Sequence, residues 1–227
     1  MARSNRHVFE MPPLLLTFAV KEELRPFQKL IGARSDLRVL LTGIGQRNAE
    51  KAIRRALSEQ SPKLVLTCGF AGGLNPELTV GTVIFSDDED FRLSPALLAA
   101  GARPAKFHCA ERVAVTTAKK CALRQSTRAD AVEMESGVIR AICREHKIPS
   151  ATVRVISDAT HEDLPLDFNL LMDAGQNLSY GKLAVALAAS PGKISELLKL
   201  QKQTKAAAEK LAEVLIKVVS DPALARL

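Results

Sequence analysis

The chain has no tryptophan, one tyrosine and eight phenylalanines, so aromatic residues make up only 4% of its 227 residues. This scarcity bears on the net charge of +7, which by itself could indicate DNA or RNA as a partner. Proteins that hold single-stranded nucleic acid stack its bases on aromatic side chains, and few are present here. We therefore expect no nucleic-acid partner, an expectation that salt-sensitive binding to DNA or RNA would contradict.

Much of the positive charge lies near the C-terminal end, where lysines are mixed with glutamates along a helical pattern. This arrangement fits a solvated helix face, or a surface that attracts an anionic substrate or a membrane. Peripheral membrane contact therefore stays open. The lysines of this segment are Lys193, Lys199, Lys202, Lys205, Lys210 and Lys217.

Cysteine is sparse as well, with four widely separated residues, no C-x-x-C pair and no histidine at zinc-finger spacing. Neither a zinc site nor a disulfide framework is indicated. His161, Glu162 and Asp163 carry metal-ligating groups in consecutive positions, but a solvated loop is the simpler interpretation. The sequence predicts no metal, and free cysteines at Cys68, Cys109, Cys121 and Cys143 fit the reducing cytoplasm.

No apolar run approaches the roughly 20 residues that a membrane-spanning helix requires. The run at residues 14–20 is short and ends in the charged residues 21–23, without the small-residue cleavage site of a signal peptide. We predict that it forms the first strand. The dinucleotide-binding fingerprint is missing too, because the glycine turn at 43–45 continues to Asn48 where the third glycine would stand.

Short apolar runs alternate with helical patterns along most of the chain, which predicts an α/β fold. With 47% hydrophobic residues the chain can bury a full core, so we expect one domain over residues 1–227. Residues 91–110 have no firm periodicity. Strands are predicted at 14–20, 38–42, 63–68, 81–86, 111–116 and 152–158, helices at 22–30, 48–59, 133–146 and within 180–219, and a loop around 119–120.

The strand at 152–158 is the one around which the predicted site is organised. It is apolar and rich in β-branched residues, and it ends abruptly in Ser157 and Asp158. Ligands of α/β proteins gather at the carboxyl ends of buried parallel strands. Residues 131–136, which include Glu135, open the helical pattern that leads into this strand. The sequence therefore delivers the carboxylates of Asp158 and Glu135 to one neighbourhood.

Three segments, taken together and in this order, resemble a known family. Residues 69–74 (GFAGGL), 132–136 (VEMES) and 154–158 (RVISD) are similar to the nucleoside phosphorylase and nucleosidase superfamily, which includes methylthioadenosine/S-adenosylhomocysteine nucleosidase, futalosine hydrolase and the purine nucleoside phosphorylases. The match covers about 14–158. The tail beyond it looks most like the hopanoid-associated phosphorylases, which are linked to adenosylhopane. The resemblance implies a three-layer α/β/α architecture with a central mixed, mostly parallel sheet, and at least a dimer.

The resemblance assigns catalytic roles to two carboxylates. Asp158 matches the general acid that protonates the leaving purine near N7, and Ser157 would orient its side chain. Without the motif, Asp158 would be a strand-end residue that caps the next segment. Glu23 stands where the nucleosidases place the carboxylate that activates water, but Glu22 fits this role as well. A solvated helix start explains both glutamates equally.

The remaining matched residues concern the sugar. Glu135 matches the residue that binds the ribose hydroxyls and stabilises positive charge on the ring. A first-turn glutamate favoured by the helix dipole is the alternative, and it is the better explanation of Glu133. Met134 would pack on the sugar or base, although a helical methionine is more often simple core. Arg154 would lie near the sugar or an anion, and it must find a partner to offset its desolvation.

The glycine turn at 69–73 permits close backbone approach to a ligand, so Phe70 and Gly72 are predicted substrate contacts. Here the chain departs from its family. Thr67 and Phe70 stand where the hexameric phosphorylases hold phosphate with an arginine and a serine, and the nucleosidases also carry a serine at the Phe70 position. This departure favours water as nucleophile, unless the lost donors are replaced by Arg25, Arg47 or Lys119.

The aromatic segment before the second motif is shortened, leaving 115–118 where a phenylalanine often holds adenine. Phe70 or Phe91 could take its place. We predict an enzyme that cleaves the N-glycosidic bond of a purine nucleoside, with a 5′-modified adenosine as first candidate, by hydrolysis or phosphorolysis. A nucleoside-binding protein without turnover is the alternative. No cofactor is predicted beyond inorganic phosphate as co-substrate, and the predicted assembly is a homodimer or larger homo-oligomer.

Overall fold

The computed structural model describes residues 14–88, 93–173, 175, 179–222 and 224. Its centre is an eight-stranded sheet whose main path runs β2, β1, β3, β8, β4, β5, with β7 paired to β3 and β6 paired to β7. The strands are β1 (Leu14–Phe18), β2 (Leu37–Leu41), β3 (Leu64–Gly73), β4 (Val83–Asp87), β5 (Arg103–Pro104), β6 (Phe107–Cys109), β7 (Ala131–Glu133) and β8 (Ser150–Asp158).

The sheet is mixed and mostly parallel, as predicted. Strand β3 lies between β1 and β8 and is parallel to both, whereas β4 pairs with β8, and β7 with β3, in the antiparallel direction. All nine residues of β8 are buried, because helices cover both faces of the sheet. The predicted strand at 152–158 is therefore an inner strand.

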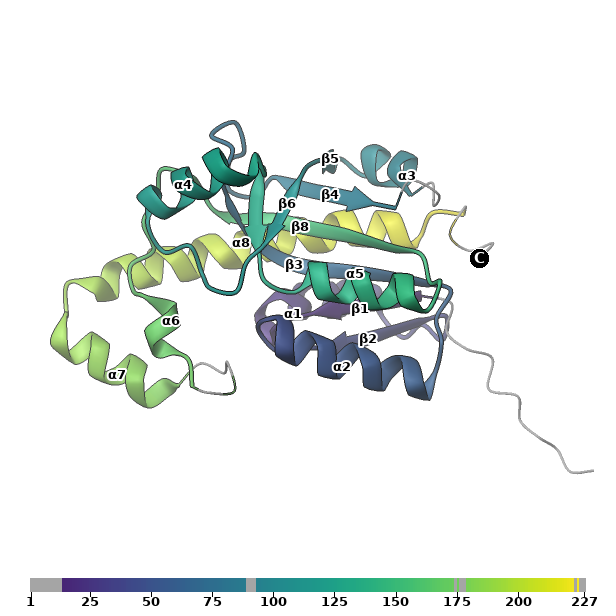
Figure 1. The fold of residues 1–227 in the computed structure, drawn as a ribbon, viewed down its shortest axis with the longest axis horizontal. Coiled ribbons are helices and arrows are strands. Elements are labelled where there is room, and N and C mark those ends of the chain that lie inside the picture. Colours follow the sequence, from purple (N-terminus) through teal and green to yellow (C-terminus); the bar gives the residue numbers. More distant parts are fainter. Residues whose placement is uncertain (1–13, 89–92, 174, 176–178, 223, 225–227) are drawn as a thin grey trace, which may run out of the picture.

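Helices cover the sheet on two sides (Figure 1). The apolar residues of α1 (Lys21–Ile31), α3 (Ser94–Ala99) and α8 (Lys193–Val219) pack with the strands in one core cluster. Those of α2 (Gln46–Glu59) and α5 (Ser136–Glu145) form a second cluster. In α2 this buried face is Ala49, Ile53, Ala56 and Leu57, the helical spacing that the sequence predicted. The predicted three-layer arrangement is confirmed.

Helix α8 belongs to the core only in its second half. The apolar spacing of the helix predicted within 180–219 places Leu211, Leu215 and Val218 in the core, and these residues are buried. The same spacing also predicts a core position for Ile194 and Leu198, which is wrong, since these residues are 46% and 59% exposed. The first turns of α8 extend beyond the sheet, on the side where α6 (Phe168–Leu171) and α7 (Tyr180–Ala189) lie (Figure 1).

Two predictions for residues 111–120 were wrong. Residues 111–116 form no strand, because their backbone bonds to the segment after β8 instead: the Leu164 N–H donates to the Val115 carbonyl at 2.8 Å. The expected loop around 119–120 is the start of α4 (Thr117–Thr127). Thr116 caps this helix by accepting the N–H of Lys119 on its hydroxyl oxygen.

Other boundaries also move. The helix predicted from residue 133 begins at Ser136, because residues 131–133 pair with β3 as strand β7. Strand β3 continues through the glycine turn to Gly73, with an irregular register between Ala71 and Gly72. Residues 91–110, which lacked periodicity, contain α3, β5 and β6. Among the described residues, every helix is too short or too polar to cross a bilayer.

Candidate active site

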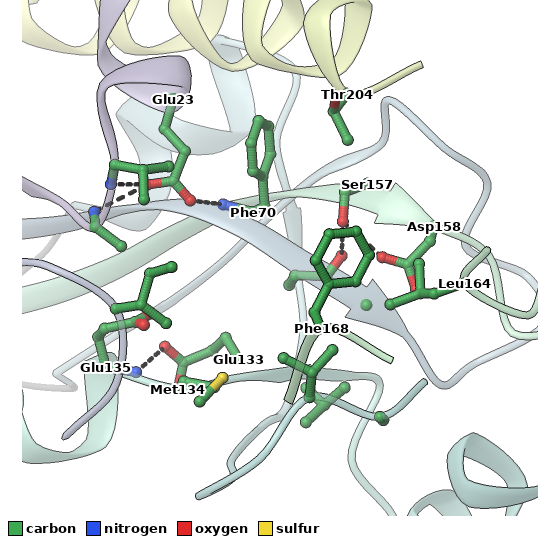
Figure 2. A pocket seen from close by; sticks show the side chains of 18 of the residues that line it. Glu23, Phe70, Glu133, Met134, Glu135, Ser157, Asp158, Leu164, Phe168 and Thr204 are labelled. Atoms are coloured by element: carbon green, nitrogen blue, oxygen red, sulfur yellow. Dashed lines mark hydrogen bonds between the residues drawn. The ribbon is translucent and has the colours of Figure 1, made fainter. Parts of the chain in front are cut away.

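A cavity of about 260 Å³ opens at the carboxyl ends of β1, β3 and β8 (Figure 2). Strand β7 and the following residues form its floor, and α6 and α8 contribute from the side of the chain that follows β8. The predicted residues Glu23, Phe70, Gly72, Met134, Glu135, Ser157 and Asp158 all line it. The sequence argument that strand ends would bring Asp158 and Glu135 to one place is therefore confirmed.

Asp158 is held on both carboxylate oxygens. The Ser157 hydroxyl donates to Oδ1 at 2.7 Å, and the Lys120 ammonium contacts Oδ2 at 2.6 Å. The carboxylate is 11% exposed and the Lys120 side chain is fully buried. Sequence reasoning missed Lys120 because it placed this residue in a loop. The threonine cap at Thr116 was the signal that could have predicted a helix there.

The absence of a side chain at Gly72 leaves space for the Asp158 carboxylate. A Cβ atom on Gly72 would lie 3.2 Å from Asp158 Oδ2 and 3.3 Å from the Val132 side chain. Both distances are tighter than ordinary contact, so a larger residue here would push the carboxylate away. The predicted close approach of the backbone at this turn is thus a close approach to Asp158.

Arg154 lies beneath the cavity, 1% exposed and outside its lining. Its Nη2 atom donates to Glu133 at 2.6 Å and to Glu135 at 3.4 Å, and Nη1 donates to the Cys68 carbonyl at 3.2 Å. Its predicted need for a partner is therefore met by carboxylates. The guanidinium is covered by the residues that it holds. A direct contact between Arg154 and a substrate is not tested by this arrangement and stays a prediction.

Glu133 does more than the helix-dipole interpretation proposed. It ends β7, and its carboxylate accepts the N–H of Glu135 at 3.0 Å and that of Ser136 at 2.7 Å, so it holds the start of α5. Burial raises the pKa of Glu133, but the Arg154 guanidinium and these N–H groups outweigh burial and bring the pKa below its usual value. Glu133 therefore favours the charged form and is the closer carboxylate partner of Arg154.

Glu135 has the opposite tendency. Its Oε1 atom accepts the Gly45 N–H at 2.8 Å, which joins the turn after β2 to the cavity. Burial raises the pKa of Glu135 to about 7; Arg154 lowers it, while Glu133 and Glu23 add to the rise. The two glutamates compete for one guanidinium, and Glu133 has the shorter contact. Because Arg154 contacts Glu135 Oε2 only at 3.4 Å, that oxygen can also accept a hydrogen bond from a ligand in the cavity.

Glu23 is the glutamate of the first helix that faces the cavity. Its carboxylate accepts the N–H groups of Ala19 and Phe70 at 2.9 and 2.8 Å, and that of Val20 at 3.2 Å. Burial raises the pKa of Glu23, while Arg154 and these N–H groups oppose the rise. Glu22 points to solvent with a side chain 66% exposed. Of the two candidates for water activation, only Glu23 has the required position.

The rest of the lining is largely apolar. Met134 is buried, and the ring of Phe168 is among the side chains that line the cavity (Figure 2). Phe168 was missed, because residues 159–175 lack any periodicity that would predict α6. The segment 115–118 is not in the lining, and Phe91 falls outside the described residues. Other apolar contributors are Val113, Ala114, Leu164 and Leu200.

The proposed substitutes for the missing phosphate donors do not reach the cavity. Arg25, Arg47 and Lys119 are exposed and absent from its lining, where the cation among the described residues is Arg112. The acidic pair Glu162 and Asp163 binds backbone N–H groups, and the described residues contain no cluster of acidic, histidine or cysteine side chains arranged to hold a metal.

Comparison with known proteins places this geometry in a family. The family model of the phosphorylase superfamily matches residues 25–108 and 99–220. A 5′-methylthioadenosine/S-adenosylhomocysteine nucleosidase of Marinomonas sp. (strain MWYL1) is 28% identical over 180 residues, which cover 63% of this chain and 78% of that relative. One of Bacillus cereus (strain B4264) is 25% identical over 182 residues, or 65% and 78%.

Solved structures agree on the fold. The nucleosidase of that name from Campylobacter jejuni superposes with a TM-score of 0.66 at 17% identity, covering 90% of this chain and 97% of the other. The futalosine hydrolase of Helicobacter pylori gives the same TM-score at 14% identity, with 91% and 96% covered. Because the family model spans most of the sequence, the chain belongs to the phosphorylase superfamily.

Proposed function

We propose that this protein is a purine nucleosidase, which cleaves the N-glycosidic bond of an adenosine derivative and releases the base. The observation that carries the proposal is the meeting of Asp158, Glu135 and Glu23 in one cavity of about 260 Å³. The named relatives are nucleosidases of adenosine derivatives, which supports the same reaction. Asp158 and Glu23 lie on different walls, as an acid and a base acting on opposite sides of a sugar would (Figure 2).

The proposed chemistry divides the work between three carboxyl groups. Asp158 gives its proton to the purine near N7, so that the bond from C1′ to the base breaks without expelling an anion. The sugar then carries oxocarbenium character, and Glu135 accepts its hydroxyl groups and stabilises the charge. Glu23 takes a proton from water as the oxygen bonds to C1′. One proton leaves Asp158 and one reaches Glu23, so the step balances.

We propose water rather than phosphate as the nucleophile. Glu23, Glu133 and Glu135 surround the place where the nucleophile would stand, and Arg154 beneath them is already shared by Glu133 and Glu135. A phosphate dianion would meet these carboxylates, and the guanidinium nearest to them, that of Arg154, is already engaged by Glu133 and Glu135. A neutral water molecule meets no such barrier. Inorganic phosphate as co-substrate is the alternative outcome of the assay below.

The test is release of base from a panel of nucleosides, with and without phosphate. We expect adenine from adenosine derivatives at a rate independent of phosphate, and no release from the 7-deaza analogue, which lacks N7. Asp158→Asn should lower kcat by about 10²–10⁴-fold. The matched control is Asp36→Asn, at a partly exposed residue outside the cavity that pairs with Arg34. Full activity of Asp158→Asn would contradict the proposal, whereas calorimetric binding without release from any member would support the nucleoside-binding alternative.

A finer proposal concerns the 5′ substituent, which we take to be large and apolar, adenosylhopane being the candidate that the sequence resemblance indicates. A second cavity of about 840 Å³ lies between α1 and α8 and shares Phe70 and Thr204 with the first. Its apolar lining includes Leu30 and Leu198, whose side chains are 57% and 59% exposed. A long substituent could run from the ribose past Thr204 onto this surface. Adenosines with 5′ alkyl groups of increasing length test this.

Assembly and location are also proposals. We propose a homodimer or larger, as the family resemblance implies, which light scattering on the purified protein tests. The four cysteines are free thiols, which supports a reducing cytoplasm. Exposed Leu170, Val185, Ile194 and Leu198 on α6, α7 and the start of α8 support peripheral contact with a membrane. Sedimentation with anionic vesicles would detect such contact, and its absence at low salt would exclude it.

A further inference from the structure

We infer that Lys120 is a positioning residue for acid catalysis, because it holds Asp158 and stabilises the carboxylate that forms when Asp158 gives its proton to the leaving base. The inference rests on the proposed nucleosidase reaction and deepens it. Its basis is the placement of a fully buried ammonium 2.6 Å from the Asp158 Oδ2 atom, on an element separate from the one that carries the acid.

Three contacts fix the position of the Lys120 ammonium group. Besides Asp158, its Nζ atom donates to the carbonyl oxygens of Ala159 at 2.7 Å and Glu162 at 2.8 Å. An ammonium has three N–H donors, so these three contacts use them all. Asp158 is the acidic side chain in this set of partners, and the other two partners are backbone carbonyls. The two carbonyls belong to the chain leaving β8, so Lys120 fixes the backbone that follows the acid as well as the acid itself.

Burying a lysine is costly unless its charge is matched, and a leucine or methionine would fill the same space without that cost. The Lys120 cation can contribute to catalysis if the charge on Asp158 changes during the reaction. When Asp158 holds a proton, the ammonium faces a neutral acid. When the proton has moved to the base, the ammonium faces an anion in a poorly solvated place, where the attraction is strong. Lys120 therefore favours the later state, which is the condition for accelerating a step.

The step itself needs no further reactant. The proton bonded to an Asp158 oxygen transfers to the purine nitrogen, and the electron pair of that O–H bond remains on the carboxylate. Ser157 donates to Oδ1 and Lys120 to Oδ2, so both oxygens of the product carboxylate keep a donor. If Lys120 served only to join α4 to the end of β8, the effect of its substitution on kcat would be the same for every leaving group.

The test compares two substrates with different leaving groups. A purine nucleoside requires the proton of Asp158, whereas p-nitrophenyl β-D-riboside expels a stable phenolate without one. We expect Lys120→Met to lower kcat for the purine nucleoside by about 10²-fold, with KM changed less than about threefold, and to leave the nitrophenyl riboside within about threefold of the parent protein. Lys119→Met, one residue away on the exposed side of α4, is the matched control.

A double variant separates positioning from general damage. If Lys120 acts through Asp158, then Lys120→Met with Asp158→Asn should be no slower on the purine nucleoside than Asp158→Asn alone. Should Lys120→Met fail to fold, Lys120→Gln retains an amide donor and Lys120→Arg retains the charge. Recovery of kcat in the arginine variant beyond the glutamine variant would then support the inference, and equal losses in both would overturn it.

Equal losses on both substrates in folded Lys120→Met, or no loss on either, would overturn the inference while leaving the proposed function intact. A parent protein that releases no base from any nucleoside would overturn both together. Thermal unfolding of each variant accompanies the kinetics, because the expected pattern requires proteins of similar fold.

Discussion

The carboxylate of Glu23 and the guanidinium of Arg154 converge on one point, the position that a Cβ atom would occupy on Gly69. That position lies 2.6 Å from Glu23 Oε1, and Arg154 Nη1 is closer still. The backbone of Gly69 has φ of +150°, which side chains rarely permit. Three elements, α1, β3 and β8, therefore bring the proposed base and its buried cation together over a glycine.

Gly69→Ala should abolish base release and destabilise the fold. Both the φ of Gly69 and the contact with Glu23 oppose a methyl group, and we expect a loss of about 2–4 kcal/mol in the free energy of unfolding. Gly101→Ala is the matched control, because Gly101 also has positive φ, at +97°, but its Cβ would meet nothing within 4 Å. Chemical denaturation measures both variants, and equal losses would show that backbone strain alone is responsible.

The raised pKa of Glu135 predicts that stability falls as pH increases. A carboxyl group whose pKa is about 7 in the folded state and about 4.3 when unfolded binds its proton more tightly in the folded state. The resulting contribution is complete below about pH 4 and is lost as pH rises toward 7, for a total of about 3–4 kcal/mol.

Comparison with Glu135→Gln isolates this contribution. Subtracting the free energy of unfolding of the variant from that of the parent protein should give a difference that declines between pH 4.5 and 7 and is level above. Glu50→Gln, on the exposed face of α2, is the matched control for the same change of side chain outside the cavity. A difference that rose with pH would show that Glu135 is charged in the folded protein over this range.

Phe168 should contribute to binding of the base through its ring. Stacking of a base on an aromatic side chain is worth about 1–3 kcal/mol, so we expect Phe168→Ala to raise KM for adenosine derivatives by about 10–100-fold. Leu170→Ala, on the same short helix with a side chain 67% exposed, should leave KM unchanged. If KM is unaffected by Phe168→Ala while kcat falls, Phe168 acts on the reacting geometry and not on base affinity.

Thr204 should determine how long a 5′ substituent the site accepts. It lines both cavities, and its hydroxyl donates to the Leu200 carbonyl at 3.0 Å. Thr204→Phe would narrow the connection, so we expect KM for long 5′-alkyl adenosines to rise by about tenfold or more while that for adenosine stays near the parent value. Thr204→Ser retains the hydroxyl and should change neither. Equal effects on short and long substrates would show that the substituent takes another path.

Sequence patterns predicted β1, β2, β3, β4 and the inner strand β8, because burial of apolar runs decides those elements. They missed β5, β6 and β7, and the strand expected at 111–116 is absent. They also predicted that Asp158 and Glu135 would share a site, since the carboxyl ends of parallel strands lie at one edge. Glu23 was indicated only by the family resemblance, which fitted Glu22 as well. Arg154 stood out as a charge within an apolar strand, and its need for a partner followed from desolvation, although the sequence did not identify the partners as Glu133 and Glu135.

The parts that were missed depend on contacts between distant segments. Lys120 looked like a loop lysine because its buried partners, Asp158 and the carbonyls after β8, lie about 40 residues away in the sequence. Glu133 resembled a first-turn helical residue because nothing local shows that residues 131–133 pair with β3. Periodicity describes one element at a time and carries no information about such pairings.

The long helix α8 has a consequence for how this protein can change. Its second half is anchored among Leu211, Leu215 and Val218, whereas Leu200 and Thr204 in the first half line the cavity and Leu198 is largely exposed. The core-packing residues and the cavity-lining residues thus belong to one helix but occupy different halves of it. Substitutions in the first half of α8 can change which molecules enter the cavity without weakening the packing of the second half. Substrate selectivity can therefore diverge faster than the fold.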